Sequence, residues 1–171
     1  MTEFHSPEET GLSWHQINEY AEDLAQRLYF KPGGNLKSIV EKWGGKIHYV
    51  DLDTWHRTDS GSVVVNKPQD FDIYISNFTT PLRDRFTVAH ELGHYVLHSM
   101  FGEKSTPMSV ERHGNTVVER EADVFAAAFL MPIGLIEESM ESGVTPEEIS
   151  RKFKVSTAAA GWRMDEVRAK T

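Results

Sequence analysis

The chain has 171 residues, of which 39% are hydrophobic and 26% are charged, a composition typical of one soluble domain with its own hydrophobic core. Its net charge of −8 argues against a protein that grips nucleic acid through a broad basic surface. The chain contains no cysteine, so disulfide frameworks and thiolate metal sites are excluded, and any metal must be held by histidine and carboxylate ligands.

The N-terminus does not have the pattern of a targeting signal. Residues 1–10 are acidic and lack the basic and then apolar run of a secretory signal. No apolar stretch approaches the roughly 20 residues that cross a bilayer. We therefore expect a cytoplasmic protein with no membrane partner.

The first elements are predicted to be helices. After a tail of residues 1–12, apolar residues recur at helical spacing behind Ser13, which is a suitable N-cap, and this pattern predicts an amphipathic helix. A shorter helix is expected from Asn35 to Trp43, where two glycines stop it.

Alternating and β-branched runs then predict three strands, at residues 46–52, 62–66 and 71–76. Turn sequences separate these runs, so we expect a small antiparallel sheet. We also expect the strand at 62–66 to lie at the edge of the sheet, where it either pairs with an extended peptide as a further strand or forms an ordinary capped edge.

Two long helices are predicted next. Thr80-Pro81 is a cap followed by a proline, which indicates a helix start, and the helix should run to about Met100. Residues 101–114 are expected to form a loop. A second helix should span residues 116–130, because the proline that follows cannot continue it.

Three short helical patterns follow Pro132, with a capping box that begins at Thr145 and a tight link at residues 154–156. The predicted fold class is α+β. We expect a small antiparallel sheet packed with a helical core over residues 13–132, then a helical extension with helix-turn-helix proportions over residues 133–171.

The segment from His90 to His94 reads His-Glu-Leu-Gly-His and lies on the first long helix. At 3.6 residues per turn, His90 and His94 project from one face a turn apart, so two imidazole nitrogens can reach one tetrahedral zinc ion. Glu91 lies at the edge of that face, where it is placed to act as a general base on water rather than as a ligand. Because the chain holds 8 histidines, the motif can also arise by chance, and its context must decide.

The second long helix supplies that context, because Glu119 and Asp123 share one of its faces. A catalytic zinc needs a third protein ligand, and we predict Glu119 for this role. A histidine ligand usually donates its other ring N–H to a carboxylate, and we predict Asp123 as that acceptor. Glu121 competes for the third ligand position, but it points roughly 200° around the helix from Glu119.

Two further histidines are candidates for the site. His98 extends the motif by another turn, but it lies roughly 12 Å from His90 along a straight helix, too far for one ion. We therefore expect His98 behind the ligands or in the core. His113, in the predicted loop, is a candidate for stabilising a transition state.

Gly93 lies inside the motif helix, where a glycine costs about 1 kcal/mol relative to alanine. Alanines occur at Ala122 and at residues 126–128 of the second helix. Small residues on both helices predict that the two helices approach closely at Gly93.

The segments RFTVAHELGH (85–94) and EREADVFAAAFLMP (119–132) together resemble the ImmA/IrrE family of metallopeptidases. The likeness extends over roughly residues 13–132. The resemblance implies a gluzincin-like, thermolysin-related site, with zinc on two histidines and a glutamate, and with Glu91 as general base.

The resemblance also implies a substrate, a helix-turn-helix transcriptional repressor whose cleavage relieves repression in a phage, a mobile element or a stress response. Two alternatives remain open: a metal-containing anti-repressor that binds its repressor without cleavage, and a DNA-binding regulator that uses the C-terminal helices. Residues 144–171 contain six Lys or Arg against four Asp or Glu, so we do not expect direct binding to nucleic acid.

Overall fold

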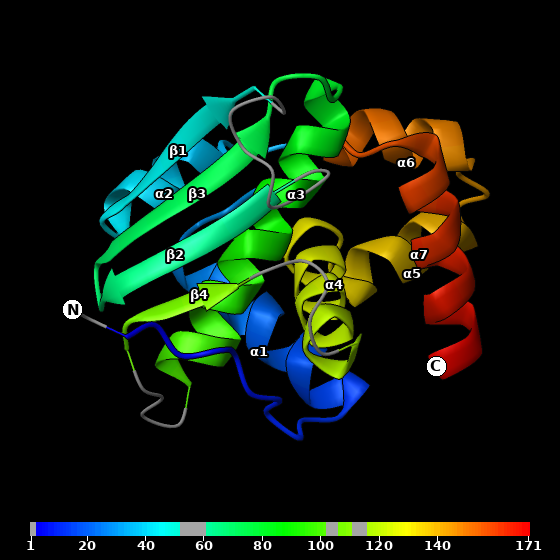
Figure 1. Cartoon of the computed structure of the whole chain (residues 1–171). Helices are drawn as coiled ribbons and strands as arrows, with labels where there is room; N and C mark the ends of the chain where they lie inside the picture. Colours follow the sequence, from blue (N-terminus) through cyan, green and yellow to red (C-terminus); the bar gives the residue numbers. More distant parts are fainter. Residues whose placement is uncertain (1–2, 52–60, 102–105, 111–115) are drawn as a thin grey trace.

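The computed structural model of the chain describes residues 3–51, 61–101, 106–110 and 116–171 (Figure 1). The helices in these ranges are α1 (Trp14–Arg27), α2 (Leu36–Lys42), α3 (Pro81–His94), the π-helix η1 (Tyr95–Met100), α4 (Thr116–Leu130), α5 (Ile133–Glu141), α6 (Pro146–Phe153) and α7 (Thr157–Lys170). The strands are β1 (Gly45–Val50), β2 (Gly61–Lys67), β3 (Asp70–Ser76) and β4 (Met108–Val110). Within the described ranges, every helix is too short or too polar to cross a membrane.

The four strands form one mixed sheet in the order β1-β3-β2-β4. Strand β3 is antiparallel to β2 but parallel to β1, with Ile47 paired to Ile73. The α+β fold class is confirmed, whereas the expectation of a purely antiparallel sheet is wrong. The reason is that β3 inserts between β1 and β2, and two chain reversals return it in the direction of β1.

Strand β2 is an interior strand, so the prediction that residues 62–66 form an edge is wrong. Strand β4 pairs antiparallel with β2, and this strand lies in the segment predicted to be a loop. Three residues are too few to display an alternating pattern. The outer edge of β4 is met by His5, which donates its N–H to Pro107 O at 2.9 Å and accepts from Ser109 N at 3.1 Å.

Capping residues set the helix starts, as the sequence predicts. Ser13 forms a capping box with Gln16 at the start of α1. Thr80 accepts a hydrogen bond from the backbone of Arg83, with a proline in the first turn of α3. Thr145 forms the predicted capping box at the start of α6. Helix α4 has the predicted bounds.

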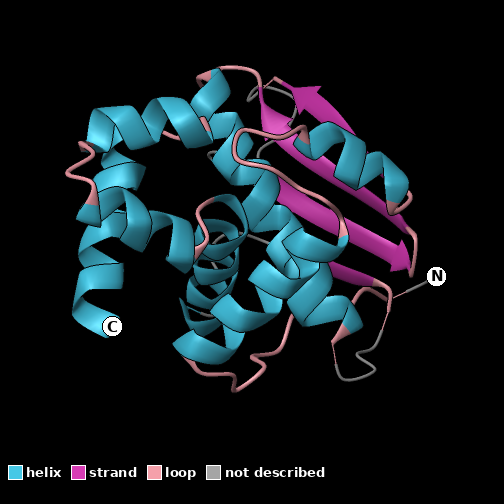
Figure 2. Cartoon of the chain, turned by 180° about the vertical axis from the view of Figure 1, so that it is seen from behind, coloured by secondary structure: helices cyan, strands magenta, loops and turns pink. Residues whose placement is uncertain are grey.

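The helices cover one face of the sheet (Figures 1 and 2). Helix α3 contacts β2 and β3 and packs along α4, which in turn packs on α1. Helices α5 to α7 lie on the side of α4 away from the sheet (Figure 1). Their apolar side chains, such as Ile136 and Phe153, belong to the same hydrophobic cluster as Ile73 of the sheet.

The motif helix ends near Met100, as predicted, but its last turns are π-helical. The backbone N–H of Phe101 donates to Val96 O, five residues back, at 3.0 Å. The hydrophobic period of the sequence does not indicate this change. It matters because η1 carries His98, and π-helical turns are frequent at functional sites.

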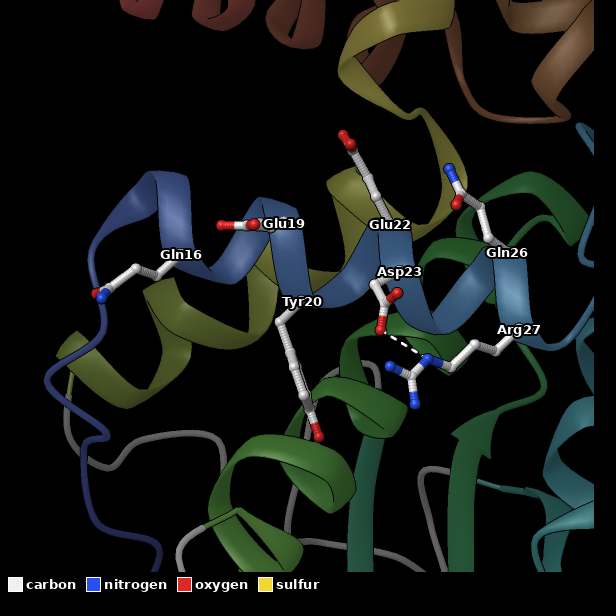
Figure 3. Close-up of a pocket in the computed structure, with 7 residues that line it drawn as sticks. All are labelled: Gln16, Glu19, Tyr20, Glu22, Asp23, Gln26 and Arg27. Atoms are coloured by element: carbon white, nitrogen blue, oxygen red, sulfur yellow. Dashed lines mark ion pairs between the residues drawn. The ribbon is translucent and has the colours of Figure 1, made fainter.

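The solvent-facing side of α1 carries polar side chains (Figure 3). Some of them pair within the helix, and others contact neighbouring elements. Asp23 and Arg27 form an ion pair of 2.8 Å across one turn. Glu22 accepts a hydrogen bond of 2.6 Å from the backbone N–H of Ile133, so α1 caps the start of α5. Tyr20 reaches the aromatic ring of Phe101 beyond η1.

Arg163 of α7 is fully buried, and its hydrogen bonds connect three elements of the fold. Its guanidinium donates to Met131 O at 3.0 Å, to Asn18 Oδ1 at 2.7 Å and to Glu166 Oε2 at 3.0 Å. The arginine therefore joins α7 to α1 and to the end of α4. The C-terminal helices are held by polar contacts as well as by apolar burial.

Candidate metal centre

Helices α3 and α4 approach closely at Gly93, as predicted. A Cβ atom at this position would lie 3.1 Å from Ala122 O and 3.1 Å from a ring carbon of Phe125. The glycine therefore admits the backbone of α4 to the face of α3 that carries the two motif histidines. This close approach brings the acidic side chains of α4 within reach of the imidazoles.

The side chains of His90, His94 and Glu119 converge on one point. Nε2 of His90 lies 3.1 Å from Nε2 of His94 and 3.1 Å from Oε2 of Glu119. Nε2 of His94 lies 3.1 Å from Oε1 of Glu119. The structure thus brings together the three residues that the sequence predicts as ligands.

These donor atoms suit a divalent cation. A tetrahedral zinc ion with bonds of roughly 2.0–2.1 Å places its ligand atoms about 3.3–3.4 Å apart, close to the spacing in the cluster. Two nitrogens and a carboxylate oxygen are also a ligand set that zinc accepts. Two imidazole lone pairs and a carboxylate repel one another at this distance unless a positive charge lies among them. The residues present therefore fit the metal.

Burial and hydrogen bonding control charge in the cluster. Burial opposes a charge on His90, but its contacts with Asp123 and Glu119 outweigh this effect and raise its pKa to about 10. Burial lowers the pKa of His94 to about 4. Burial also opposes the charge of Glu119, yet the two histidines hold its pKa well below the usual range. A cation bound at the cluster would compete with a proton for the Nε2 lone pair of His90.

His90 is held from behind by Asp123, whose Oδ1 lies 2.7 Å from Nδ1 of the ring. A carboxylate only accepts, so Nδ1 carries the proton and Nε2 faces the cluster. This is the arrangement that the sequence predicts for Asp123. The side chain of Asp123 remains about half exposed, at 49%.

His98 and Glu121 lie behind the other histidine. Nδ1 of His98 is 3.0 Å from Nδ1 of His94, and Nε2 of His98 is 3.1 Å from Oε1 of Glu121. Neither residue belongs to the cluster of three donors, so the structure does not bring Glu121 to the metal position. Burial lowers the pKa of His98 to about 4. Sequence reasoning missed the pairing of Glu121 with His98, because no spacing rule relates two residues on different helices.

Glu91 is the remaining motif residue; it follows His90 in the sequence and is buried, with 1% of its surface exposed. His113, the candidate for stabilising a transition state, lies outside the described residues. A cavity of about 600 Å³ opens beside Asp123, between α4, α7 and the residues on both sides of the start of α1, and Trp14, Val117 and Trp162 line it. The Asp123 side of the cluster therefore borders on solvent-accessible space.

Comparisons with known proteins identify relatives of this chain. The sequence profile of the IrrE N-terminal-like domain matches residues 46–165. The chain is 32% identical over 106 residues to the radiation response metalloprotease IrrE of Deinococcus radiodurans, an alignment that covers 58% of this chain and 32% of that protein. A solved structure of a Mycobacterium tuberculosis transcriptional regulator matches with a TM-score of 0.58 and 18% identity, over 85% of this chain and 45% of the other.

The last likeness concerns the fold alone, because the identity is low. The chain spans about a third of the length of the curated relative and less than half of the solved chain. The matching profile covers well over half of this chain, including the motif helix and α4. The resemblance read from the two motifs is thereby confirmed, and the chain belongs to the family of IrrE N-terminal-like domains.

Proposed function

We propose that this chain is a cytoplasmic zinc-dependent metalloendopeptidase that cleaves a helix-turn-helix transcriptional repressor. The observation that carries the proposal is the cluster of His90, His94 and Glu119. The Nε2 atoms of the two histidines lie 3.1 Å from each other, and each lies 3.1 Å from a carboxylate oxygen of Glu119. Glu91 follows His90 directly in the sequence. Residues 13–132 form the peptidase unit in this proposal, and residues 133–171 form a helical extension that packs on it.

The proposed chemistry is hydrolysis of a peptide bond. His90, His94 and Glu119 would hold a zinc ion, which would supply Lewis acidity towards the scissile carbonyl and the attacking water. Glu91 accepts the proton of the attacking water and passes it to the leaving amine. Asp123 keeps the proton of His90 on Nδ1, so the ring presents its lone pair to the cluster.

The proposed substrate rests on the family resemblance of the two motifs rather than on the geometry of the site. The curated relative is a metalloprotease named for a radiation response, which supports a role in stress-dependent regulation. A repressor is a suitable target because a single cut that separates its DNA-binding helices from the rest relieves repression. The runner-up, a metal-containing anti-repressor that binds its repressor without cleavage, does not need a general base at Glu91.

The Glu91→Gln variant tests the proposal. The substitution keeps the size of the side chain but removes its ability to accept a proton, and the loss of a positioned general base typically costs about 10²–10⁴ in rate. We expect zinc to remain bound at one ion per chain while cleavage of the repressor stops. The assay incubates each variant with a helix-turn-helix protein encoded beside this chain, and gel electrophoresis follows the intact repressor.

A chelator and a matched variant complete the experiment. Chelator should stop the wild-type reaction, and added zinc should restore it. Glu138→Gln is the control, because this glutamate lies on α5 outside the cluster. If Glu91→Gln relieves repression as well as the wild type does and the repressor stays intact, binding without cleavage replaces the proposed function.

A further inference from the structure

His94 has a contact that the proposed chemistry does not use. Its Nδ1 atom lies 3.0 Å from Nδ1 of His98, whose Nε2 lies 3.1 Å from Oε1 of Glu121. All three side chains are buried. The Glu121 carboxylate also accepts two hydrogen bonds from the backbone N–H of Thr10, at 3.0 and 3.2 Å, and one from the Thr10 hydroxyl. A continuous line of polar groups therefore connects His94 to the segment before α1.

The hydrogen bonds that Thr10 donates to Glu121 determine which nitrogens of His98 and His94 carry protons. A backbone N–H only donates and a carboxylate only accepts, so Glu121 presents an acceptor to His98. His98 must then carry its proton on Nε2, and a neutral ring has its lone pair on Nδ1. That lone pair accepts the Nδ1–H of His94. The lone pair of His94 is left on Nε2, among the donor atoms of the cluster.

The opposite tautomer of His98 would disable the cluster. A proton on Nδ1 of His98 would face Nδ1 of His94 and require a lone pair there, so the proton of a neutral His94 would move to Nε2. A protonated Nε2 cannot bind a metal ion. The buried carboxylate of Glu121 excludes this tautomer, because it would leave Nε2 of His98 facing Glu121 without a proton to donate.

The two motif histidines are thus held in different ways. Asp123 contacts His90 directly at 2.7 Å and is about half exposed. His94 instead contacts the imidazole of His98, which in turn contacts the buried carboxylate of Glu121. The π-helical turn η1 carries that second imidazole, which gives the irregular end of the motif helix a specific role.

We propose that His98 and Glu121 are positioning residues that fix the tautomer and the ring orientation of His94 for metal binding, with Thr10 as the anchor of the line. The inference rests on the proposed zinc site but not on the identity of the substrate. Partners of this kind typically change metal affinity by about 10–100-fold when they are lost.

Nuclear magnetic resonance of the zinc-loaded full chain, with ¹⁵N-labelled histidines, tests the proton positions directly. We expect the proton of His94 on Nδ1 and the proton of His98 on Nε2. A His98 ring protonated on Nδ1 would overturn the proposal. This readout does not depend on catalysis.

Zinc affinity, measured by competition with a chromogenic chelator, tests the energetic role. We expect His98→Phe to raise the dissociation constant by about 10–100-fold, because it keeps a planar ring but loses both nitrogens. His98→Gln retains one acceptor and one donor and should recover part of the affinity. Cobalt substitution gives a second readout, since a reoriented His94 alters the visible spectrum of the bound ion.

Two further variants keep the test decisive if His98→Phe folds poorly. Glu121→Gln replaces one acceptor oxygen with an amide donor and should weaken zinc binding less than His98→Phe. Thr10→Val removes one donor and should weaken zinc binding least. Ser139→Ala, which deletes a buried hydroxyl far along the chain, should leave zinc binding unchanged.

Affinities within twofold of wild type in well-folded His98 and Glu121 variants would refute the proposal. Failure of the wild type to bind zinc would refute the proposed zinc site and this inference together, whereas tight binding without cleavage would refute only the proposed function.

Discussion

Gly93→Ala probes how closely the two helices must approach to assemble the cluster. The new Cβ would lie 3.1 Å from Ala122 O and 3.2 Å from Ala122 Cα, both backbone atoms that cannot rotate away. It would also lie 3.1 Å from a ring carbon of Phe125. Ordinary contact begins at 3.4 Å, so α4 must move outward by a few tenths of an ångström.

Two opposing effects determine how much Gly93→Ala changes the stability of the chain. Alanine in place of glycine stabilises a helix interior by about 1 kcal/mol. Overpacking of a close contact costs about 1–3 kcal/mol, so the net loss of stability should be between about 0 and 2 kcal/mol. Metal binding should suffer more, because Glu119 lies one turn before Ala122 and ligand distances must hold within about 0.2 Å. We expect the zinc dissociation constant to rise at least about tenfold, while the melting temperature of the metal-free chain falls by roughly 0–8 °C.

Chelator competition and thermal denaturation of the same samples measure both effects. Gly161→Ala is the matched control, because Gly161 is also interior to a helix and a Cβ there would meet nothing within 4 Å. This control should gain stability and keep its affinity for zinc. If Gly93→Ala also gains about 1 kcal/mol of stability and binds zinc as the wild type does, the close approach has no role in building the site.

Other predictions concern the ligands, the core and the C-terminal helices. Glu119→Ala should lose zinc binding under conditions where Glu121→Gln still binds, as metal analysis after dialysis will report; the reverse order would reassign the third ligand. Zinc at 100 times its dissociation constant should stabilise the chain by about 2.7 kcal/mol, and urea denaturation with and without the metal will measure this. Arg163→Met should destabilise the chain by about 3–5 kcal/mol, because it leaves buried partners such as Asn18 without a donor; a loss under 1 kcal/mol in urea denaturation would contradict this. No sub-micromolar, salt-sensitive DNA binding is expected in a mobility-shift titration, because the chain is acidic; such binding would favour the regulator alternative.

Local signals in the sequence determined the helices and the core of the candidate site. The caps Ser13, Thr80 and Thr145 act on backbone groups within one turn, so their helices begin where the residues predict. The spacing of His90 and His94 likewise places both side chains on one face of a helix, whatever the rest of the fold. The assignment of Glu119 required one tertiary assumption, that α3 and α4 pack face to face, and the small residues at Gly93 and Ala122 already indicated it.

Contacts between residues far apart in the sequence were decided by the tertiary structure. The alternation of a strand reports which face is buried but not which neighbour it pairs with, so the parallel pairing of β1 with β3 and the interior place of β2 did not follow from it. Strand β4 is too short to carry a pattern, and η1 depends on packing rather than on period. The line from Thr10 through Glu121 to His98 joins residues up to 111 positions apart. A buried glutamate and a solvated one look identical in sequence, because burial is a property of the packed chain and not of the residue.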